Sequence, residues 1–290
     1  MYIAIDVGGS KTRIAKSDDL TAIAAAEDFL TPKKFEQGIE RITAVSQKLT
    51  AGEPPQAIII GLPGILDKTA GKIKLAPNLP QWNNKEITAV IAQKIKTAVF
   101  LENDSALGGL GEAVLGAGRD KKIVAYLALG TGVGGGRIVN KKIDGAGLGF
   151  EPGHQLIVPD GDLWSCGQRG CLEAYVSGTA FAKRYGVNPK ECGDLKIWQE
   201  YAQWLGRGMI NLLVLWSPEI IVLGGSMARS APLFLPSLQI FIEQNLKVGE
   251  APPIVQGALD DKAGIYGGLS FLKQIANEGS NVRLGTAPVQ

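Results

Sequence analysis

An aspartate, two glycines and a hydroxyl-rich turn directly follow the first apolar run of the chain. Residues 6–12 read Asp-Val-Gly-Gly-Ser-Lys-Thr and come after the apolar residues 2–5. Glycines let backbone N–H groups approach phosphate oxygens closely, and a carboxylate can hold a metal-bound water beside them. An ordinary hairpin turn uses the same residue types. The stretch alone therefore indicates either a phosphate site or a plain turn.

A second glycine loop follows a longer apolar run in the second half of the chain. Residues 130–136 read Gly-Thr-Gly-Val-Gly-Gly-Gly and come directly after the apolar residues 123–129. This loop lacks the lysine of a Walker loop and the spacing of a dinucleotide fingerprint. Two strand–turn–strand loops, one in each half, could hold a nucleotide triphosphate from both sides. Two glycine hairpins without a ligand are the simpler alternative.

Asp104 is the candidate for proton removal. The sequence Glu102-Asn103-Asp104 ends a predicted strand, where a side chain can project into a crevice. Phosphoryl transfer to a hydroxyl needs positioning, charge neutralisation and a carboxylate that takes the proton. An aspartate in this place can also simply cap the next helix, and the residues alone favour that interpretation.

The elements that must position these residues alternate along both halves. Apolar residues at helical spacing predict a helix over 35–49 and another over 204–215, and residues 21–27 form a predicted strand. Each half opens with a strand, a glycine and hydroxyl turn, and a returning strand. This weak repeat predicts two similarly built α/β domains. We expect a smaller domain over 1–104 and a larger one over 105–290, whose final helix near 262–275 can pack back on the first.

Composition excludes several classes of function. The 290 residues carry a net charge of +2, with lysine and arginine scattered along the chain, so we expect no nucleic-acid or membrane partner. No apolar run approaches the roughly 20 residues that span a bilayer, and the first residues lack a signal peptide's basic region. An odd count of three cysteines does not form a disulfide framework. We therefore expect a cytoplasmic protein with reduced thiols.

Together these motifs resemble the ROK family of sugar kinases, repressors and related open reading frames, within the hexokinase and actin-like ATPase superfamily. The two glycine loops match the family's phosphate motifs, and Leu-Gly-Gly-Ser at 223–226 matches its adenosine motif. Glu-Pro-Gly-His at 151–154, followed by Cys-Gly-Gln-Arg-Gly-Cys-Leu-Glu at 166–173, matches its signature. The resemblance covers residues 2 to 273. It implies an α/β fold of two actin-like (ribonuclease H-like) domains with a cleft between them.

The resemblance implies ATP-dependent phosphorylation of a hexose, with glucose to glucose 6-phosphate as the first choice, ATP and Mg²⁺ as cofactors, and a homodimer. Fructose, mannose, N-acetylmannosamine and N-acetylglucosamine stay open as substrates. Asp104 would be the general base. The implied sugar-binding residues are Gly64, Asn78, Asn103, Asp104, Glu151, His154 and Glu173. The implied residues for the nucleotide and its Mg²⁺ are Asp6, Gly8, Gly9, Ser10, Lys11, Thr12, Gly130, Thr131, Gly132, Val133, Gly224, Gly225 and Ser226.

The family's zinc pattern is incomplete in this chain. The resemblance implies one histidine and three cysteines, but Trp164 stands where the first cysteine belongs, which leaves His154, Cys166 and Cys171. A closed structural zinc site normally has four protein ligands. The alternatives are a weaker three-ligand site completed by water, a fourth thiolate from Cys192, and a zinc-free loop with Trp164 packed over it. Loss of zinc would affect sugar affinity more than phosphoryl transfer.

Two functions of other classes are alternatives to a kinase. Repressors of this family carry a helix-turn-helix segment before the first phosphate motif, which here starts at residue 6 and leaves no room for one. A non-catalytic sugar-binding protein would not need Asp104 together with both glycine loops. We therefore expect an enzyme.

Overall fold

The computed structural model describes residues 1–145 and 149–279, which form two compact units. Unit 1 consists of Met1–Asp104 and the C-terminal segment from Ile265 onward, and unit 2 is Ser105–Gly264. The final helix α8 (Ala263–Gly279) lies against unit 1: a Cβ added to Gly268 would lie 2.9 Å from the Ile59 side chain. The second unit therefore ends at Gly264, short of the predicted boundary at 290, and the final helix packs on the first unit in the way that was allowed for the segment near 262–275.

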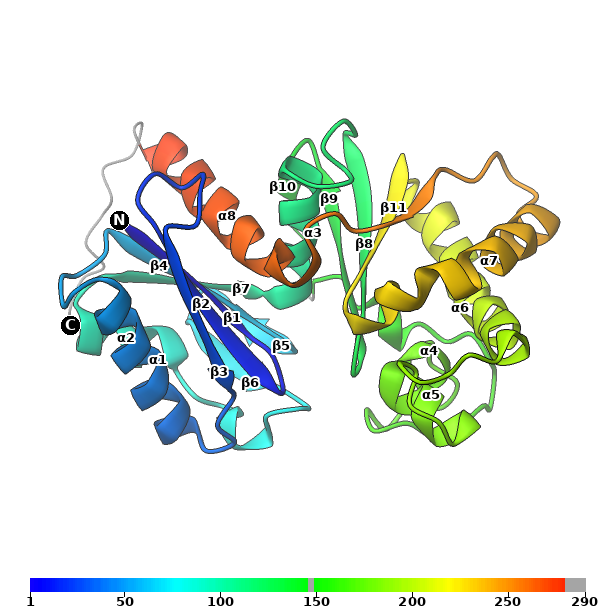
Figure 1. The fold of residues 1–290 in the computed structure, drawn as a ribbon, viewed down its shortest axis with the longest axis horizontal. Helices are drawn as coiled ribbons and strands as arrows, with labels where there is room; N and C mark the ends of the chain where they lie inside the picture. Colours follow the sequence, from blue (N-terminus) through cyan, green and yellow to red (C-terminus); the bar gives the residue numbers. More distant parts are fainter. Residues whose placement is uncertain (146–148, 280–290) are drawn as a thin grey trace. The chain divides into compact units, whose positions relative to one another are not determined.

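Unit 1 is built on a five-stranded sheet in the order β3-β2-β1-β4-β7 (Figure 1). The first three strands in that order pair antiparallel, and the last three pair in parallel. The strands are β1 (Tyr2–Val7), β2 (Lys11–Ser17), β3 (Ala25–Leu30), β4 (Ala57–Leu62) and β7 (Ala98–Asn103). A small hairpin of β5 (Ile65–Asp67) and β6 (Lys72–Leu75) and a short 3-10 helix η1 (Pro80–Trp82) complete the unit.

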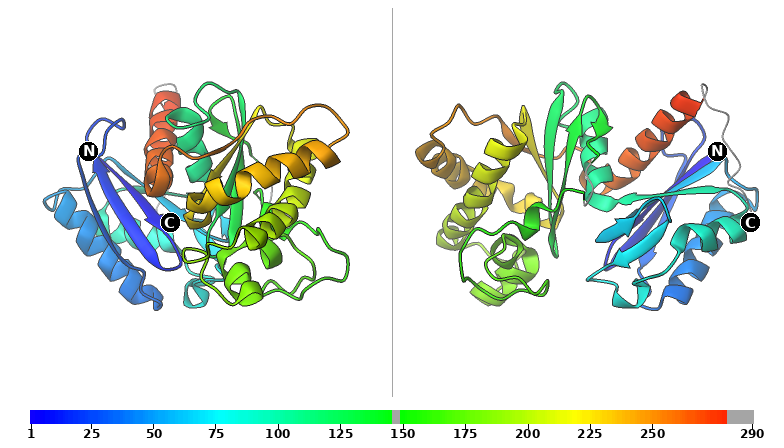
Figure 2. Two further views of the ribbon diagram at one scale, coloured as in Figure 1. Left: turned by 45° about the vertical axis from the view of Figure 1, so that its right-hand side comes forward. Right: turned by 180° about the vertical axis from the view of Figure 1, so that it is seen from behind.

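The two faces of this sheet are covered by different helices. Side chains alternate between faces along a strand, and the β4 residues Ile58 and Ile60 belong to the core cluster under α1 (Phe35–Leu49) and α2 (Ile87–Ile95). Ile59 points the other way and meets α8 at Gly268. Figure 2 shows α1 and α2 on one side of the sheet and α8 on the other. Because both faces are buried, β4 is apolar throughout.

Unit 2 repeats the sheet order with a different set of helices. Its strands follow the order β10-β9-β8-β11-β12, again antiparallel at one end and parallel at the other. They are β8 (Ile123–Leu129), β9 (Val133–Val139), β10 (Lys142–Ile143), β11 (Ile220–Gly224) and β12 (Ile254–Gln256). The helices are α3 (Asp104–Val114), α4 (Glu173–Val176), α5 (Gly178–Tyr185), α6 (Leu195–Trp216) and α7 (Ala231–Asn245). Three short 3-10 helices are η2 (Pro152–His154), η3 (Ser226–Ser230) and η4 (Asp260–Lys262).

Helix α6 begins earlier than the sequence pattern predicted, at Leu195 instead of Trp204. Asp194 caps its first turn by accepting the Lys196 N–H at 2.8 Å. Trp198 and Tyr201, in the part that was missed, are fully buried and pack on Phe234 of α7. Burial raises the pKa of the Tyr201 hydroxyl. The aromatic layer between α6 and α7 is thus part of the core of unit 2.

A buried carboxylate organises the loop that follows β12. The Glu112 side chain of α3 is 1% exposed and accepts the backbone N–H groups of Ala117, Ala258 and Leu259 at 2.8–3.0 Å. These bonds satisfy a charge that would otherwise be costly to bury. Among residues 1–145 and 149–279, no helix combines the length and the apolar character needed to cross a membrane.

Candidate active site

The first glycine loop joins β1 to β2 and is closed by its own backbone. Val7 pairs with Thr12 across the hairpin, and the Gly8 N–H donates to the Lys11 carbonyl at 2.9 Å. Asp6, near the end of β1, lies 3.6 Å from the Arg13 guanidinium on β2. Lys11 forms an ion pair with Asp28 on β3. The loop therefore presents glycine backbone at the tip and a partly exposed carboxylate at its base.

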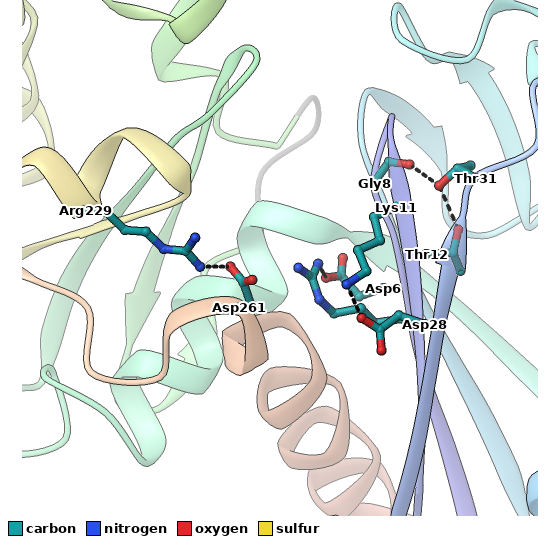
Figure 3. A network of polar contacts seen from close by, with 9 residues as sticks. Asp6, Gly8, Lys11, Thr12, Asp28, Thr31, Arg229 and Asp261 are labelled. Atoms are coloured by element: carbon teal, nitrogen blue, oxygen red, sulfur yellow. Dashed lines mark hydrogen bonds and ion pairs between the residues drawn. The ribbon is translucent and has the colours of Figure 1, made fainter. Parts of the chain in front are cut away.

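A pair of buried threonines braces this loop from behind. The Thr31 hydroxyl donates to the Gly8 carbonyl at 2.7 Å and accepts the Thr12 hydroxyl at 2.9 Å (Figure 3). Thr12 is 0% and Thr31 5% exposed. The family resemblance implies that Thr12 is one of the nucleotide-binding residues. Because its hydroxyl is buried and bonded to Thr31, the Thr12 side chain can serve a ligand only through the shape that it gives to the loop.

Two of the expected sugar-binding residues of unit 1 lie together, and a third lies beside the loop. The Asn103 side-chain amide forms a long hydrogen bond of 3.5 Å to the Gly64 carbonyl. Gly64 has φ +100°, and an added Cβ would lie 2.1 Å from the Leu75 carbonyl, so only glycine fits there. Asn78 packs on Gly9, where an added Cβ would lie 2.7 Å from the Asn78 Cβ.

Asp104 follows the C-terminal end of β7 and begins α3. The strand end before it is fixed by Glu102, which is 5% exposed and accepts the Asn103 N–H at 2.7 Å. The ammonium of Lys68, in the turn between β5 and β6, lies 2.5 Å from the Glu102 carboxylate. Sequence reasoning missed Lys68, because only the folded hairpin brings it to this strand end.

The second glycine loop joins β8 to β9 and lies against the N-terminus of α5. The Gly178 N–H donates to the Gly130 carbonyl at 2.7 Å, and the Thr179 hydroxyl donates to the Thr131 carbonyl at 2.8 Å. The Gly130 N–H donates to the Gly132 carbonyl at 2.9 Å and closes the turn. A helix N-terminus favours anions nearby.

Glu173 reaches this loop from α4. Its Oε2 accepts the Val133 N–H at 2.7 Å, and its Oε1 accepts the indole N–H of Trp164 at 2.8 Å. A Cβ added to Gly132 would lie 2.6 Å from the same Oε2. Glycine at 132 therefore lets the carboxylate approach the loop closely.

A pocket of about 410 Å³ opens beside the second loop, within unit 2. Gly225 of the expected adenosine motif has φ +83°, and an added Cβ would lie 2.4 Å from the Leu129 carbonyl, so Ser226 is held next to the loop. The volume is in the range of small-molecule sites, roughly 300–1,000 Å³. Its lining comprises Gly130, Thr131, Gly178, Thr179, Ala182, residues 186–190, Ser226, Met227 and Ser230.

Sequence reasoning missed residues 186–190 and the start of α5 as parts of this pocket. Gly186 ends α5 in the left-handed conformation, at φ +69°. Asn188-Pro189 follows as a turn signal in the sequence, which predicts a loop but not what the loop lines.

The lone histidine and two cysteines form a cluster. The ligand atoms of His154, Cys166 and Cys171 all lie within 4.8 Å of one another, and the two sulfurs are 4.0 Å apart. Within the described part of the chain, the buried Nδ1 of His154 has no hydrogen-bond partner. Burial raises the pKa of the Cys171 thiol to about 11. One imidazole and two thiols gathered in this way are a donor set that suits zinc.

Cys192 is not part of this cluster in the described chain. It lies in the core of unit 2, where its carbonyl accepts the Trp198 indole N–H at 2.9 Å. The expectation that Cys192 could supply a fourth thiolate therefore finds no support. Glu151 precedes η2 and His154 is its last residue. This short helix packs on β9: a Cβ added to Gly153 would lie 2.2 Å from the Val133 carbonyl.

Two α/β units with the same sheet order, each with a glycine hairpin between its first two strands, define the actin-like class of two-domain fold. The sequence matches the ROK family over residues 2–275, and the chain belongs to this family. A glucokinase of Thermotoga maritima is 30% identical, with 94% of this chain and 97% of that protein aligned.

Solved structures agree with this assignment. The ROK hexokinase of Thermus thermophilus superposes with a TM-score of 0.84 at 28% identity, over 95% of this chain and 99% of that one. A ROK glucokinase of Streptomyces griseus, in complex with glucose and AMPPNP, superposes with a TM-score of 0.82 at 28% identity, over 94% of this chain and 99% of that one.

Proposed function

We propose that this protein is an ATP-dependent hexose kinase that converts glucose to glucose 6-phosphate. The observation that carries the proposal is the near full-length similarity to a relative solved with glucose and AMPPNP. Both glycine loops and Asp104 are present in this chain, which is what a kinase of this kind needs. Fructose, mannose and the N-acetylated hexosamines are the alternative acceptors.

Unit 2 would bind the adenine nucleotide. Its pocket of about 410 Å³ has room for a base and ribose beside Ser226 and Met227. The loop between β8 and β9 forms one wall of the same pocket, and its glycines suit phosphate oxygens. The N-terminus of α5, against which that loop is held, adds a favourable field for phosphate.

Unit 1 would supply the base and part of the sugar contacts. Asp104 accepts the proton of the acceptor hydroxyl as that oxygen bonds to the γ-phosphorus, and the bond from this phosphorus to the oxygen of the departing ADP breaks. Asn78, Asn103 and the backbone at Gly64 orient the sugar hydroxyls. Glu151, His154 and Glu173 are the sugar contacts that we assign to unit 2.

Asp6 and the glycine loop that follows it would serve the transferring phosphates and their Mg²⁺. The Asp6 carboxylate is partly exposed at the base of the loop, and hard cations prefer oxygen ligands of this kind. When bound, Mg²⁺ neutralises phosphate charge.

We also propose that His154, Cys166 and Cys171 bind zinc as three protein ligands. Cys166 is exposed, so water can complete the coordination. Protein prepared without chelator should then contain zinc, and zinc should slow the reaction of Cys166 with a thiol reagent. Cys192, which is buried outside the cluster, is the internal control for that measurement. The zinc site would be contradicted if the preparations contained no zinc and added zinc left the reactivity of Cys166 unchanged.

A coupled assay of ADP release across a panel of hexoses tests the proposed function. We expect sugar-dependent turnover with the highest kcat/KM for glucose. Turnover with another hexose instead of glucose would support the kinase activity and contradict glucose as the substrate. The absence of turnover with every sugar would contradict the kinase itself.

A further inference from the structure

We propose that Trp164 is a positioning residue for sugar binding, which acts by holding the carboxylate of Glu173. The inference rests on the proposed function in one respect, that Glu173 contacts the sugar. Trp164 stands at a position where the family's pattern has a metal ligand, but an indole N–H can only donate a hydrogen bond. In this chain the donor reaches Glu173 directly, at 2.8 Å.

The Glu173 carboxylate is held at both oxygens and still has capacity for a ligand. One oxygen accepts the Val133 N–H at 2.7 Å and the other accepts the Trp164 N–H. A carboxylate has about four lone-pair sites, so two protein donors leave room for sugar hydroxyls. The side chain is half-buried, which limits competition from water. Two fixed donors therefore leave it one orientation.

Trp164 is itself well anchored. Its N–H donates to the Gln168 carbonyl at 2.9 Å, and its carbonyl accepts the Gly167 N–H at 3.0 Å, which closes a tight turn. The half-buried indole packs against the core of unit 2, and the Lys183 ammonium lies 5.8 Å from the ring centroid. The indole donor is therefore presented from a fixed frame.

These contacts connect the turn that contains Trp164 and Cys166 to the β8–β9 loop. The indole of Trp164 donates to Glu173, and Glu173 accepts the backbone N–H of Val133. The three residues lie within one unit, so the link does not depend on how the two units are arranged. A charge-assisted hydrogen bond is stronger than a neutral one. Its removal should loosen Glu173 and lower the affinity for the sugar more than the rate of phosphoryl transfer.

The test is Trp164→Phe, which keeps an aromatic ring and removes the indole donor. We expect the KM for glucose to rise about tenfold, because one charge-assisted hydrogen bond is lost. The kcat at saturating glucose and the KM for ATP should each change by less than about twofold. The lost contact stabilises the ground state and the transition state equally, and the hydrogen bond from Val133 to Glu173 remains. An unchanged KM for glucose would overturn the proposal.

Trp204→Phe is the matched control. The Trp204 indole also donates to a carboxylate, Glu200, at 3.2 Å, in an exposed hydrogen bond. Its ring packs on Tyr175, with the ring centroids 4.6 Å apart, and phenylalanine keeps an aromatic ring in that place. We expect wild-type kinetics from this variant. A similar rise in the KM for glucose in both variants would indicate a general loss of packing and would overturn the specific role of Trp164.

A double-mutant cycle with Glu173→Gln separates positioning from structural support. If Trp164 acts through Glu173, the double variant should have the same KM for glucose as Glu173→Gln alone. Additive effects would show that Trp164 acts by another route. Amide exchange at Val133 gives a readout without turnover: it should become faster in Trp164→Phe and stay unchanged in Trp204→Phe.

The exchange measurement also distinguishes the two proposals. Suppose that the wild-type protein phosphorylates no hexose but amide exchange at Val133 is faster in Trp164→Phe. This result would contradict the proposed function and still support the link from Trp164 to Glu173. Normal turnover with unchanged exchange would keep the kinase and overturn the link.

Discussion

The two glycine loops occupy the same place in two sheets of the same order, yet they are braced in different ways. In unit 1 the bracing groups are neutral hydroxyls, Thr12 and Thr31, behind the loop. In unit 2 a carboxylate, Glu173, and the N-terminus of α5 hold the loop. A hydrogen bond to a charged group is roughly twice as strong as a neutral one. The loop of unit 2 is therefore the more firmly held of the two.

Each loop also contains one glycine that makes room for a proposed sugar-binding side chain. Gly9 admits Asn78 in unit 1, and Gly132 admits Glu173 in unit 2. Asn78 is exposed and can give way, whereas Glu173 is held by two donors. In both units a glycine loop and a proposed sugar-binding side chain are therefore packed together, with different tolerance for change.

The largest effect should come from a difference at the far edge of the two sheets. Strand β7 leads into Asp104, while its counterpart β12 leads into backbone that donates to the buried Glu112. Only unit 1 therefore offers a carboxylate directly after the edge strand in question, which is β7 in unit 1 and β12 in unit 2. We expect Asp104→Asn to lower kcat by roughly 10²–10⁴-fold, the range for a general base, with glucose binding by calorimetry largely kept.

Asp120→Asn is the control for that substitution. The Asp120 side chain is 85% exposed and pairs with Arg119 on the surface, and such pairs contribute little. Its turnover should equal that of the wild type. Near-normal turnover of Asp104→Asn would show that Asp104 is not the general base.

Gly132→Ala should give the next largest effect. The new Cβ would lie 2.6 Å from Glu173 Oε2, so the carboxylate must leave the Val133 N–H. Losing that bond costs about 1–2 kcal/mol, which corresponds to roughly a 5- to 30-fold fall in kcat/KM for glucose. Steady-state kinetics with glucose varied at saturating ATP measure it.

The matched control is Gly193→Ala, where an added Cβ meets nothing within 4 Å. This variant should keep the wild-type kcat/KM. An equal loss in both variants would mean that Gly132 is sensitive for reasons unrelated to Glu173.

Gly9→Ala should have a smaller effect on the same measurement. The new Cβ would lie 2.7 Å from the Asn78 Cβ, but Asn78 is exposed in a turn and can move away. We expect about a threefold rise in the KM for glucose, well under the roughly 1.4 kcal/mol of a tenfold change. A larger effect than that of Gly132→Ala would reverse the comparison between the loops.

The sequence predicted the features of the fold and the site that depend on local signals. Glycines directly after apolar runs identified both hairpin loops, and the spacing over 35–49 predicted α1 with its bounds. The strand predicted over 21–27 lies instead at Ala25–Leu30, because Asp19 accepts the Thr21 and Ala22 N–H groups and extends the turn.

The rest depends on contacts between residues far apart in the chain. Lys68 reaches Glu102, and Val133 reaches Glu173, only after the sheets have formed. No periodicity or short motif records such pairs. Thr12 shows the converse, since a hydroxyl in a phosphate motif suggested a ligand contact, while burial against Thr31 gives it a bracing role.

Thr31→Val should have the smallest effect, on local stability. The substitution keeps the shape and leaves the Gly8 carbonyl and the buried Thr12 hydroxyl without their partner. We expect the opening free energy of the β1–β2 loop to fall by about 1 kcal/mol. Amide exchange of the loop suits this measurement, because a two-unit chain need not unfold in one step.

Thr179→Val makes the same change in unit 2. Its hydroxyl donates to the Thr131 carbonyl at 2.8 Å from an exposed position, so water can replace it. The loss there should stay below about 0.5 kcal/mol, as for most surface substitutions. If the exposed hydroxyl matters as much as the buried one, the loop of unit 2 depends on α5 more than on Glu173, and the carboxylate is not the main source of its rigidity.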